Sequence, residues 1–173
     1  MRAEARLAKE GVHLKVYDCY RPARAVHAFA AWSKAPGHDE MKRIFYPALD
    51  KSRLFALGYI ASRSKHSLGI AVDVGLVETA DANLPSPHQA GACDGAFADR
   101  PRESSLDLGT AFDCFSEVSA TASPAISAEA RANRGRLRQS LESEGYRNYA
   151  REWWHFEFID KRAPSVPYDF PVR

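Results

Sequence analysis

The sequence has no long apolar run, no internal repeat and no dense cluster of one charge. No stretch approaches the ~20 consecutive apolar residues of a membrane-spanning helix, so no membrane span is predicted. The 24 Lys and Arg residues nearly balance the 22 Asp and Glu residues and are scattered, which makes nucleic acid a poor candidate partner. The densest basic stretch, residues 131–138, is better explained as the solvent-facing side of a helix than as a phosphate-binding surface.

Cysteine is also scarce. The chain has Cys19, Cys93 and Cys114, so it can form at most one internal disulfide. A bond between Cys93 and Cys114 would close a loop-rich stretch and stabilise it by roughly 3 kcal/mol if the compartment is oxidising. Two unpaired thiols are an equally good interpretation of the sequence alone.

The length of 173 residues and the ordinary apolar and charged fractions predict one compact domain over residues 1–173. Strands and helices alternate without a regular βαβ order, which favours an α+β fold: a small central antiparallel sheet flanked by helices. Residues 78–107, rich in Pro, Gly, Asp, Ser and Ala, are predicted to be a loop insertion. Spacing and capping predict helices over 2–10, 22–35, 39–46, 50–57 and 127–144, and strands over 12–16, 69–77 and 154–159.

His66 and Asp73 are the first pair with metal-binding chemistry. They lie in SRSKHSLGIAVD, where a turn at residues 67–69 followed by a strand would let both side chains approach one point. Zinc readily accepts imidazole and carboxylate ligands. A His and an Asp at this separation are common by chance, so a hydrogen-bonded structural pair is the better interpretation of these two residues alone.

A second pattern, Glu152-Trp153-Trp154-His155, places two aromatic residues between a carboxylate and an imidazole at the start of a strand. His155 would supply a third ligand, and a site of two histidines and one aspartate leaves zinc a fourth position for water, as catalytic zinc requires. Glu152 would then be the general base that takes a proton from this water. Taken singly, Glu152 is better interpreted as an exposed acid and the tryptophans as core residues.

Arg21 and Asp113 are further candidates. Arg21, in YDCYRP, offers a planar guanidinium that could stabilise a carbonyl oxygen gaining charge; a surface ion pair with Asp18 is the alternative. Asp113, in LDLGTAFDCF, could hold a substrate ammonium group, although a helix N-cap is equally natural from the spacing.

Together, YDCYRP, SKHSLGIAVD, LDLGTAFD and EWWHFEF resemble the motifs of the D-alanyl-D-alanine dipeptidases, the VanX-like zinc peptidases, in that family's order and over nearly the whole chain. The resemblance implies hydrolysis of the D-Ala-D-Ala dipeptide with one Zn²⁺. It implies His66, Asp73 and His155 as the zinc ligands. It also implies Glu152 as the catalytic base and Arg21 as the group that stabilises the tetrahedral intermediate.

The resemblance further suggests that Ser64 and Asp113 bind the substrate, Asp113 by pairing with the free amino end. The preference for D-residues comes from the resemblance alone. The stretch around Cys93 is a candidate lid that restricts the site to small substrates. A Cys93–Cys114 bond would favour the periplasm over the alternative compartment, the cytoplasm.

Two other functions stay open. A zinc D,D-carboxypeptidase or endopeptidase acting on peptidoglycan stem peptides would use the same metal centre in a more open cleft. A zinc-stabilised binding module without turnover is less favoured, because a structural zinc needs neither Glu152 nor Arg21. The ligand set suits zinc better than magnesium or calcium. The sequence makes no prediction of the oligomeric state.

Overall fold

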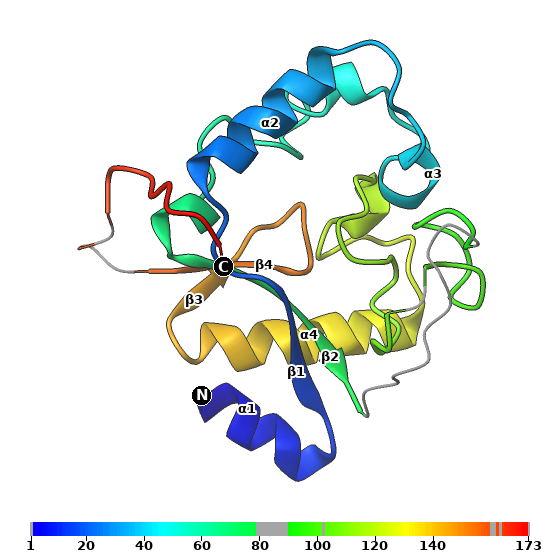
Figure 1. The fold of residues 1–173 in the computed structure, drawn as a ribbon. Coiled ribbons are helices and arrows are strands. Elements are labelled where there is room, and N and C mark those ends of the chain that lie inside the picture. Colours follow the sequence, from blue (N-terminus) through cyan, green and yellow to red (C-terminus); the bar gives the residue numbers. More distant parts are fainter. Residues whose placement is uncertain (1, 79–89, 102, 160–161, 163, 173) are drawn as a thin grey trace.

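The computed structural model describes residues 2–78, 90–101, 103–159, 162 and 164–172. At its centre is a four-stranded antiparallel sheet in the order β1-β2-β4-β3 (Figure 1). The sheet and the helices around it form one small domain, which confirms the predicted α+β fold. The strands are β1 (His13–Asp18), β2 (Ala71–Val77), β3 (Tyr146–Asn148) and β4 (His155–Phe158).

The helices form two groups. In Figure 1, α1 (Arg2–Leu7) and α4 (Ala128–Glu142) lie together at the bottom of the view, and both contact the sheet. At the top of the view α2 (Ala23–Lys34) lies beyond the sheet, with α3 (Lys42–Phe45) beside it. None of the described helices is long and apolar enough to cross a bilayer. Short 3-10 helices occur at η1 (Ala8–Glu10), η2 (Lys51–Arg53), η3 (His66–Leu68) and η5 (Glu117–Ser119).

The main core lies between the sheet and the pair α1 and α4. Leu137 and Leu141 of α4 are fully buried there. Trp153 and Trp154 are buried in the same cluster, so the interpretation of both as core residues is confirmed. Burying large apolar side chains of this kind is the main stabilising contribution in a domain of this size.

The helix α4 begins as its sequence predicts. The Ser127 hydroxyl accepts a hydrogen bond from the amide of Ala130 at 3.0 Å, which satisfies one of the free amides of the first turn. The helix ends at Glu142, two residues before the predicted end at Glu144. Gly145 follows with φ +89°, a conformation that favours glycine.

The structure differs from the prediction at one helix and adds one strand. The expected helix over 50–57 is only the 3-10 turn Lys51–Arg53, because the amide of Tyr59 turns back to the carbonyl of Leu54 and Gly58 reverses the chain with φ +79°. Strand β3 was not predicted, since three residues are too short to show an alternating pattern.

The predicted insertion at 78–107 lies partly outside the described residues, which lack 79–89 and 102. Its described parts, 90–101 and 103–107, form turns and bends. That the stretch is an insertion stays a prediction.

Candidate metal centre

His66, Asp73 and His155 converge on one point. His155 Nδ1 lies 2.9 Å and His66 Nε2 lies 3.2 Å from the same Asp73 oxygen, and the two nitrogens are 3.2 Å apart. Four tetrahedral ligands at the usual zinc distances of ~2.0–2.1 Å would stand about 3.3–3.4 Å from one another. The three atoms therefore form a triangle of nearly the size that a zinc ion needs, with a donor set that suits it.

The sheet and one turn bring these ligands together. In the β2–β4 pairing, Asp73 and His155 are direct partners. His66 comes from η3, after which Gly69 with φ +68° reverses the chain so that β2 can start at Ala71. The turn and strand expected between His66 and Asp73 are thus confirmed.

Two further groups orient the histidine rings, and the sequence analysis identified neither. The Cys19 carbonyl accepts a hydrogen bond from His66 Nδ1 at 2.8 Å, which directs Nε2 toward the ligand point. Glu157 lies 3.8 Å from His155 Nε2. Glu157 could have been found, because it lies two residues after His155 on the same face of β4. A backbone carbonyl leaves no signal in the sequence.

Asp73 and His155 each shift the pKa of the other toward the charged form. Burial raises the pKa of Asp73, but hydrogen bonds from His155 and His66 outweigh this effect and lower it to about 2. Burial lowers the pKa of His155, but its hydrogen bond to Asp73 and the nearby carboxylate of Glu157 raise it to about 9. Asp73 is therefore ionised at neutral pH, and His155 holds a proton that a metal ion would have to displace.

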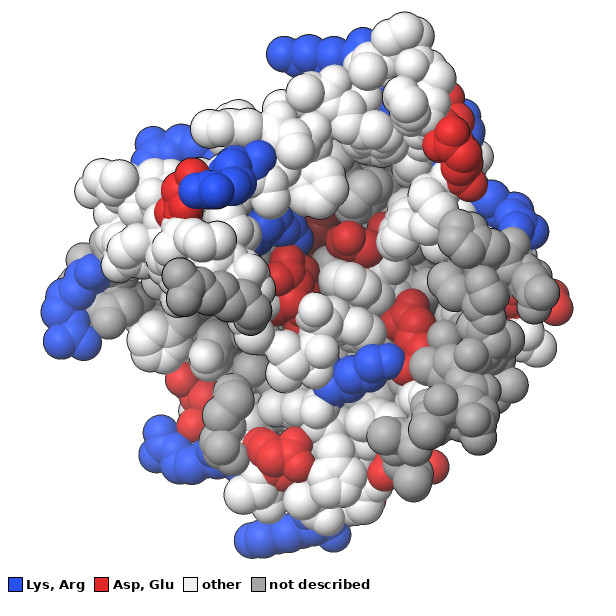
Figure 2. Space-filling view, viewed as in Figure 1, with Lys and Arg blue, Asp and Glu red and all other residues white. Residues whose placement is uncertain are grey.

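The triad borders a cleft of about 700 Å³. The cleft is also lined by Glu152, Arg21, Ser64 and Asp113, so the structure brings all of the predicted site residues to one place. Figure 2 shows acidic side chains inside the hollow, below α2, while most of the basic side chains lie near the edge of the view. The cleft walls are rich in aromatic rings, among them Phe29, Trp32, Phe45, Tyr59, Phe115 and Tyr149.

Glu152 is buried, with 8% of its surface exposed, so the interpretation of this residue as an exposed acid is wrong. Burial raises its pKa to about 8; the charge of His155 opposes this effect, while that of Asp113 adds to it. A tight turn fixes its backbone, because its amide donates to the Tyr149 carbonyl at 3.0 Å and its carbonyl accepts from Asn148 Nδ2 at 3.1 Å. Glu152 is therefore buried and held by the turn that leads to His155.

Arg21 both forms an ion pair and lines the cleft. Its Nε and Nη2 donate to one Asp18 oxygen at 3.0 and 2.7 Å, so the predicted alternative, an ion pair with Asp18, is present. Its guanidinium also lies 5.6 Å from the centre of the Phe29 ring. Its backbone carbonyl accepts from Ser67 Oγ at 2.7 Å, which ties Arg21 to the turn that carries His66. The ion pair thus orients a guanidinium that still reaches the site.

Ser64 and Asp113 also line the cleft, Ser64 from a position before Asp73 in the sequence and Asp113 from a position after it. The Ser64 hydroxyl accepts from the amide of His66 at 3.2 Å, which helps to fix η3. Burial, and next the charge of Asp73, raise the pKa of Asp113 to about 7. Asp113 is no helix N-cap, because the nearest following helix, η5, is capped by Ser116, whose hydroxyl accepts from the amide of Val118.

Comparison with known proteins identifies the family. The family model described as D-ala-D-ala dipeptidase, peptidase M15, matches residues 1–86 and 78–173, which together cover the chain. The chain is 32% identical to the D-alanyl-D-alanine dipeptidase of Enterococcus faecium over all 173 residues, which span 75% of that protein. It is 31% identical to the enzyme of the same name from Enterococcus faecalis, over 98% of the chain and 74% of that protein. With the Streptomyces coelicolor enzyme of that name, the identity is 30% over 99% of the chain and 74% of the relative. The chain therefore belongs to the D-Ala-D-Ala dipeptidase family of M15 peptidases, a family of metallopeptidases.

Proposed function

We propose that this peptidase hydrolyses the D-Ala-D-Ala dipeptide with one zinc ion held by His66, Asp73 and His155. The observation that carries the proposal is the triangle of ligand atoms, 2.9–3.2 Å on a side, on the wall of a cleft of about 700 Å³. Zinc bound there would supply a Lewis acid that polarises the scissile carbonyl and makes water more acidic. The family of dipeptidases to which the chain belongs supports the choice of substrate.

Glu152 is the proposed general base. Its carboxyl is buried next to the triad, and its raised pKa of about 8 makes it a stronger base than an exposed carboxylate. A dication in the site would lower this pKa toward neutrality, so that the group is ionised at neutral pH. Glu152 would take a proton from the attacking water and return it to the leaving amine.

Arg21 is the proposed partner of the carbonyl oxygen as negative charge develops on it. The Asp18 carboxylate occupies Nε and Nη2, which leaves Nη1 free of that ion pair. A hydrogen-bond donor that is oriented before the reaction needs little reorganisation, and such preorganised donors are the main source of electrostatic stabilisation in sites of this kind. The ion pair with Asp18 would hold the Arg21 guanidinium in this orientation.

Asp113 and Ser64 are the proposed substrate-binding residues. Asp113 lines the cleft on its own loop, apart from the sheet that carries Asp73 and His155, and its carboxylate can pair with the ammonium group of the dipeptide. The Ser64 hydroxyl lies at the start of the turn that carries His66 and can contact the substrate beside the metal.

A zinc D,D-carboxypeptidase on longer stem peptides is a second candidate. The cleft of about 700 Å³ falls within the range of ~300–1,000 Å³ that is typical of sites for drug-sized ligands. A dipeptide of two alanines is smaller than such ligands, so the cleft volume is also compatible with a longer peptide. The alternative of a binding module without turnover is not proposed, because the relatives are named dipeptidases.

The periplasm is the proposed compartment. Cys93 and Cys114 form a disulfide, and structural disulfides persist in oxidising compartments and are rare in the cytosol. Oxidation of both cysteines in protein isolated under conditions that block thiol exchange would support this assignment, and free thiols would contradict it.

Hydrolysis of D-Ala-D-Ala, L-Ala-L-Ala and a stem pentapeptide ending in D-Ala-D-Ala tests the function. Zinc-loaded and chelator-stripped protein are compared by amine release. We expect zinc-dependent cleavage of the D,D-dipeptide and little cleavage of the other two. Cleavage of the pentapeptide would favour the carboxypeptidase, and no cleavage by zinc-loaded protein would refute both.

A further inference from the structure

Asp113 has a backbone conformation that residues with side chains rarely adopt. Its φ is +58°, in the left-handed region, where aspartate is tolerated better than most residues but less well than glycine. Such a conformation persists when the surrounding structure holds the chain on both sides. The contacts of the loop 108–120, which carries Asp113, therefore decide where its carboxylate points.

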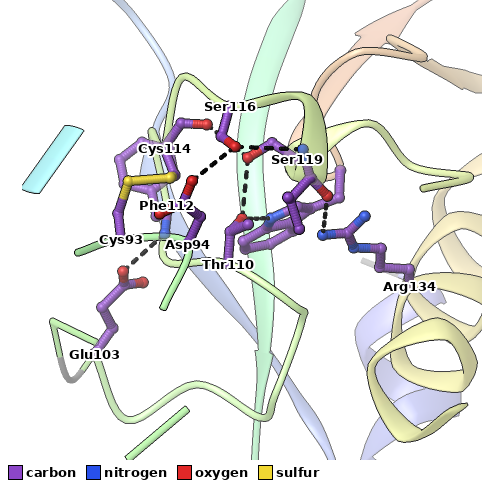
Figure 3. The surroundings of a disulfide bond; sticks show 11 residues. Cys93, Asp94, Glu103, Thr110, Phe112, Cys114, Ser116, Ser119 and Arg134 are labelled. Atoms are coloured by element: carbon purple, nitrogen blue, oxygen red, sulfur yellow. Dashed lines mark hydrogen bonds between the residues drawn. A yellow bond between two sulfur atoms is a disulfide. The ribbon is translucent and has the colours of Figure 1, made fainter. Parts of the chain in front are cut away.

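The base of this loop is held by α4. The buried Arg134 donates to the backbone carbonyls of Leu108 at 2.7 Å, Ala120 at 2.6 Å and Val118 at 3.1 Å. These bonds close the two ends of the loop against one side chain, and Figure 3 shows Arg134 beside the loop. Because they lie away from Asp113, they fix the base of the loop and leave its tip to other contacts.

The tip of the loop is held by the segment around Cys93. The amide of Ala111 donates to the Cys93 carbonyl at 2.9 Å, and Ser116 Oγ donates to Asp94 at 2.9 Å. Between these two contacts Cys93 and Cys114 form a disulfide, with Cα atoms 5.6 Å apart and both residues fully buried (Figure 3). The covalent bond thus joins the residue directly after Asp113 to a second segment.

Both joined segments are also tied to α3. The amide of Cys93 donates to the Arg43 carbonyl at 3.3 Å, and the amide of Phe115 donates to the Phe45 carbonyl at 2.6 Å. Phe45 and Phe115 themselves line the cleft. The disulfide therefore closes a set of contacts that fixes the tip of the loop relative to the cleft wall.

We propose that the Cys93–Cys114 disulfide positions Asp113, holding its carboxylate where it binds the ammonium group of the dipeptide. The inference rests on the proposed function, in which Asp113 binds the free amino end. Both cysteines are buried in a small cluster with Ala111 and are absent from the cleft lining, so they act through the loop and not by contact with substrate. The disulfide is thus a determinant of substrate affinity and not of the metal centre.

A double-mutant cycle tests this role. Steady-state hydrolysis of D-Ala-D-Ala is measured for zinc-loaded wild type, Cys93→Ser/Cys114→Ser, Asp113→Asn and the triple variant. Loss of the disulfide should raise KM about tenfold, equivalent to about 1.4 kcal/mol, with little change in kcat or zinc content. In the Asp113→Asn background the same loss should have no further effect on KM, because nothing remains to be positioned.

Leu141→Ala is the matched control for lost stability, since Leu141 is fully buried in the main core between α4 and the sheet. It should lower the melting temperature without raising KM. If the serine variants do not fold, wild type and Asp113→Asn are compared after reduction with a phosphine, with the same expectation.

Two results would overturn the proposal. One is an unchanged KM when the disulfide is lost from the otherwise wild-type protein. The other is a rise in KM of the same size in the wild-type and the Asp113→Asn backgrounds, because the disulfide would then act independently of the Asp113 carboxylate. A lack of hydrolysis by the zinc-loaded wild type would instead refute the proposed function on which the inference rests.

Discussion

Replacing Glu157 with glutamine should shift the pH dependence of zinc binding. Glu157 lies 3.8 Å from His155 Nε2 and contributes to the raised pKa of His155, about 9. Because zinc has to displace the proton of His155, the apparent affinity should rise about tenfold per pH unit and level off near pH 9. The levelling pH therefore reports the pKa of His155.

The size of the shift follows from the geometry. Two unit charges at the 3.8 Å between Glu157 and His155 interact by about 4 kcal/mol at an effective dielectric constant of about 20. This is an upper limit, because the Glu157 side chain is 18% exposed and also pairs with Arg147 at 3.4 Å. We expect about a third of this interaction energy to act on the protonated His155, which corresponds to roughly one pKa unit. In Glu157→Gln, the pH at which the zinc affinity levels off should therefore fall from about 9 to about 8.

Competition with a chromophoric zinc chelator between about pH 6 and pH 10 measures this shift. Glu157→Gln also removes a group that orients the ligand His155, which weakens zinc binding at every pH. The diagnostic quantity is therefore the pH at which the affinity levels off, and not the affinity itself. Glu129→Gln, an exposed acid in the first turn of α4, is the matched control and should behave as wild type. Equal levelling pH values for Glu157→Gln and wild type would refute the reasoning.

Three further predictions concern the site residues. Glu152→Gln should keep one zinc per chain and lose on the order of 10²–10⁴ in kcat, because the proton acceptor is gone. Metal analysis together with hydrolysis assays checks this prediction, and near-normal turnover would contradict it. Arg21→Ala should lower kcat on the order of 10²-fold with a smaller change in KM, and a rise in KM alone would make Arg21 a ground-state binder. In chelator-treated protein, the lowered pKa of Asp73, about 2, should add about 2–3 kcal/mol of stability that is present above pH ~4 and is lost as the pH falls toward 2. Urea unfolding of wild type and Asp73→Asn should therefore differ above pH ~4 and converge near pH 2; a constant difference would contradict this.

The sequence predicts those parts of the site whose geometry is local. One turn and the start of a strand separate His66 from Asp73, and both elements can be recognised from Gly69 and the alternating residues that follow. The pairing of β2 with β4, which sets Asp73 against His155, is a long-range contact. Periodicity does not reveal strand pairing. The residue types around His155 therefore indicate a third ligand, but not the pairing that sets it against Asp73.

Backbone groups account for much of what the sequence could not predict. Residues 164–172 of the C-terminal tail form no helix or strand, but the amide of Tyr168 donates to the Ser67 carbonyl at 2.7 Å and its carbonyl accepts from the amide of Ala23 at 3.0 Å. The tail thus supports the segments that carry both His66 and Arg21. Such contacts, like that of the Cys19 carbonyl with His66, depend on main-chain position and leave little trace in residue identity.

Titration of chelator-stripped protein with Zn²⁺, with D-Ala-D-Ala hydrolysis followed at each step, tests the central claim most directly. The account predicts that activity rises in proportion to added zinc and levels off at one equivalent per chain, and that His66→Ala shows neither tight binding nor activity. Full activity in the stripped protein, or unchanged zinc-dependent activity in His66→Ala, would contradict it.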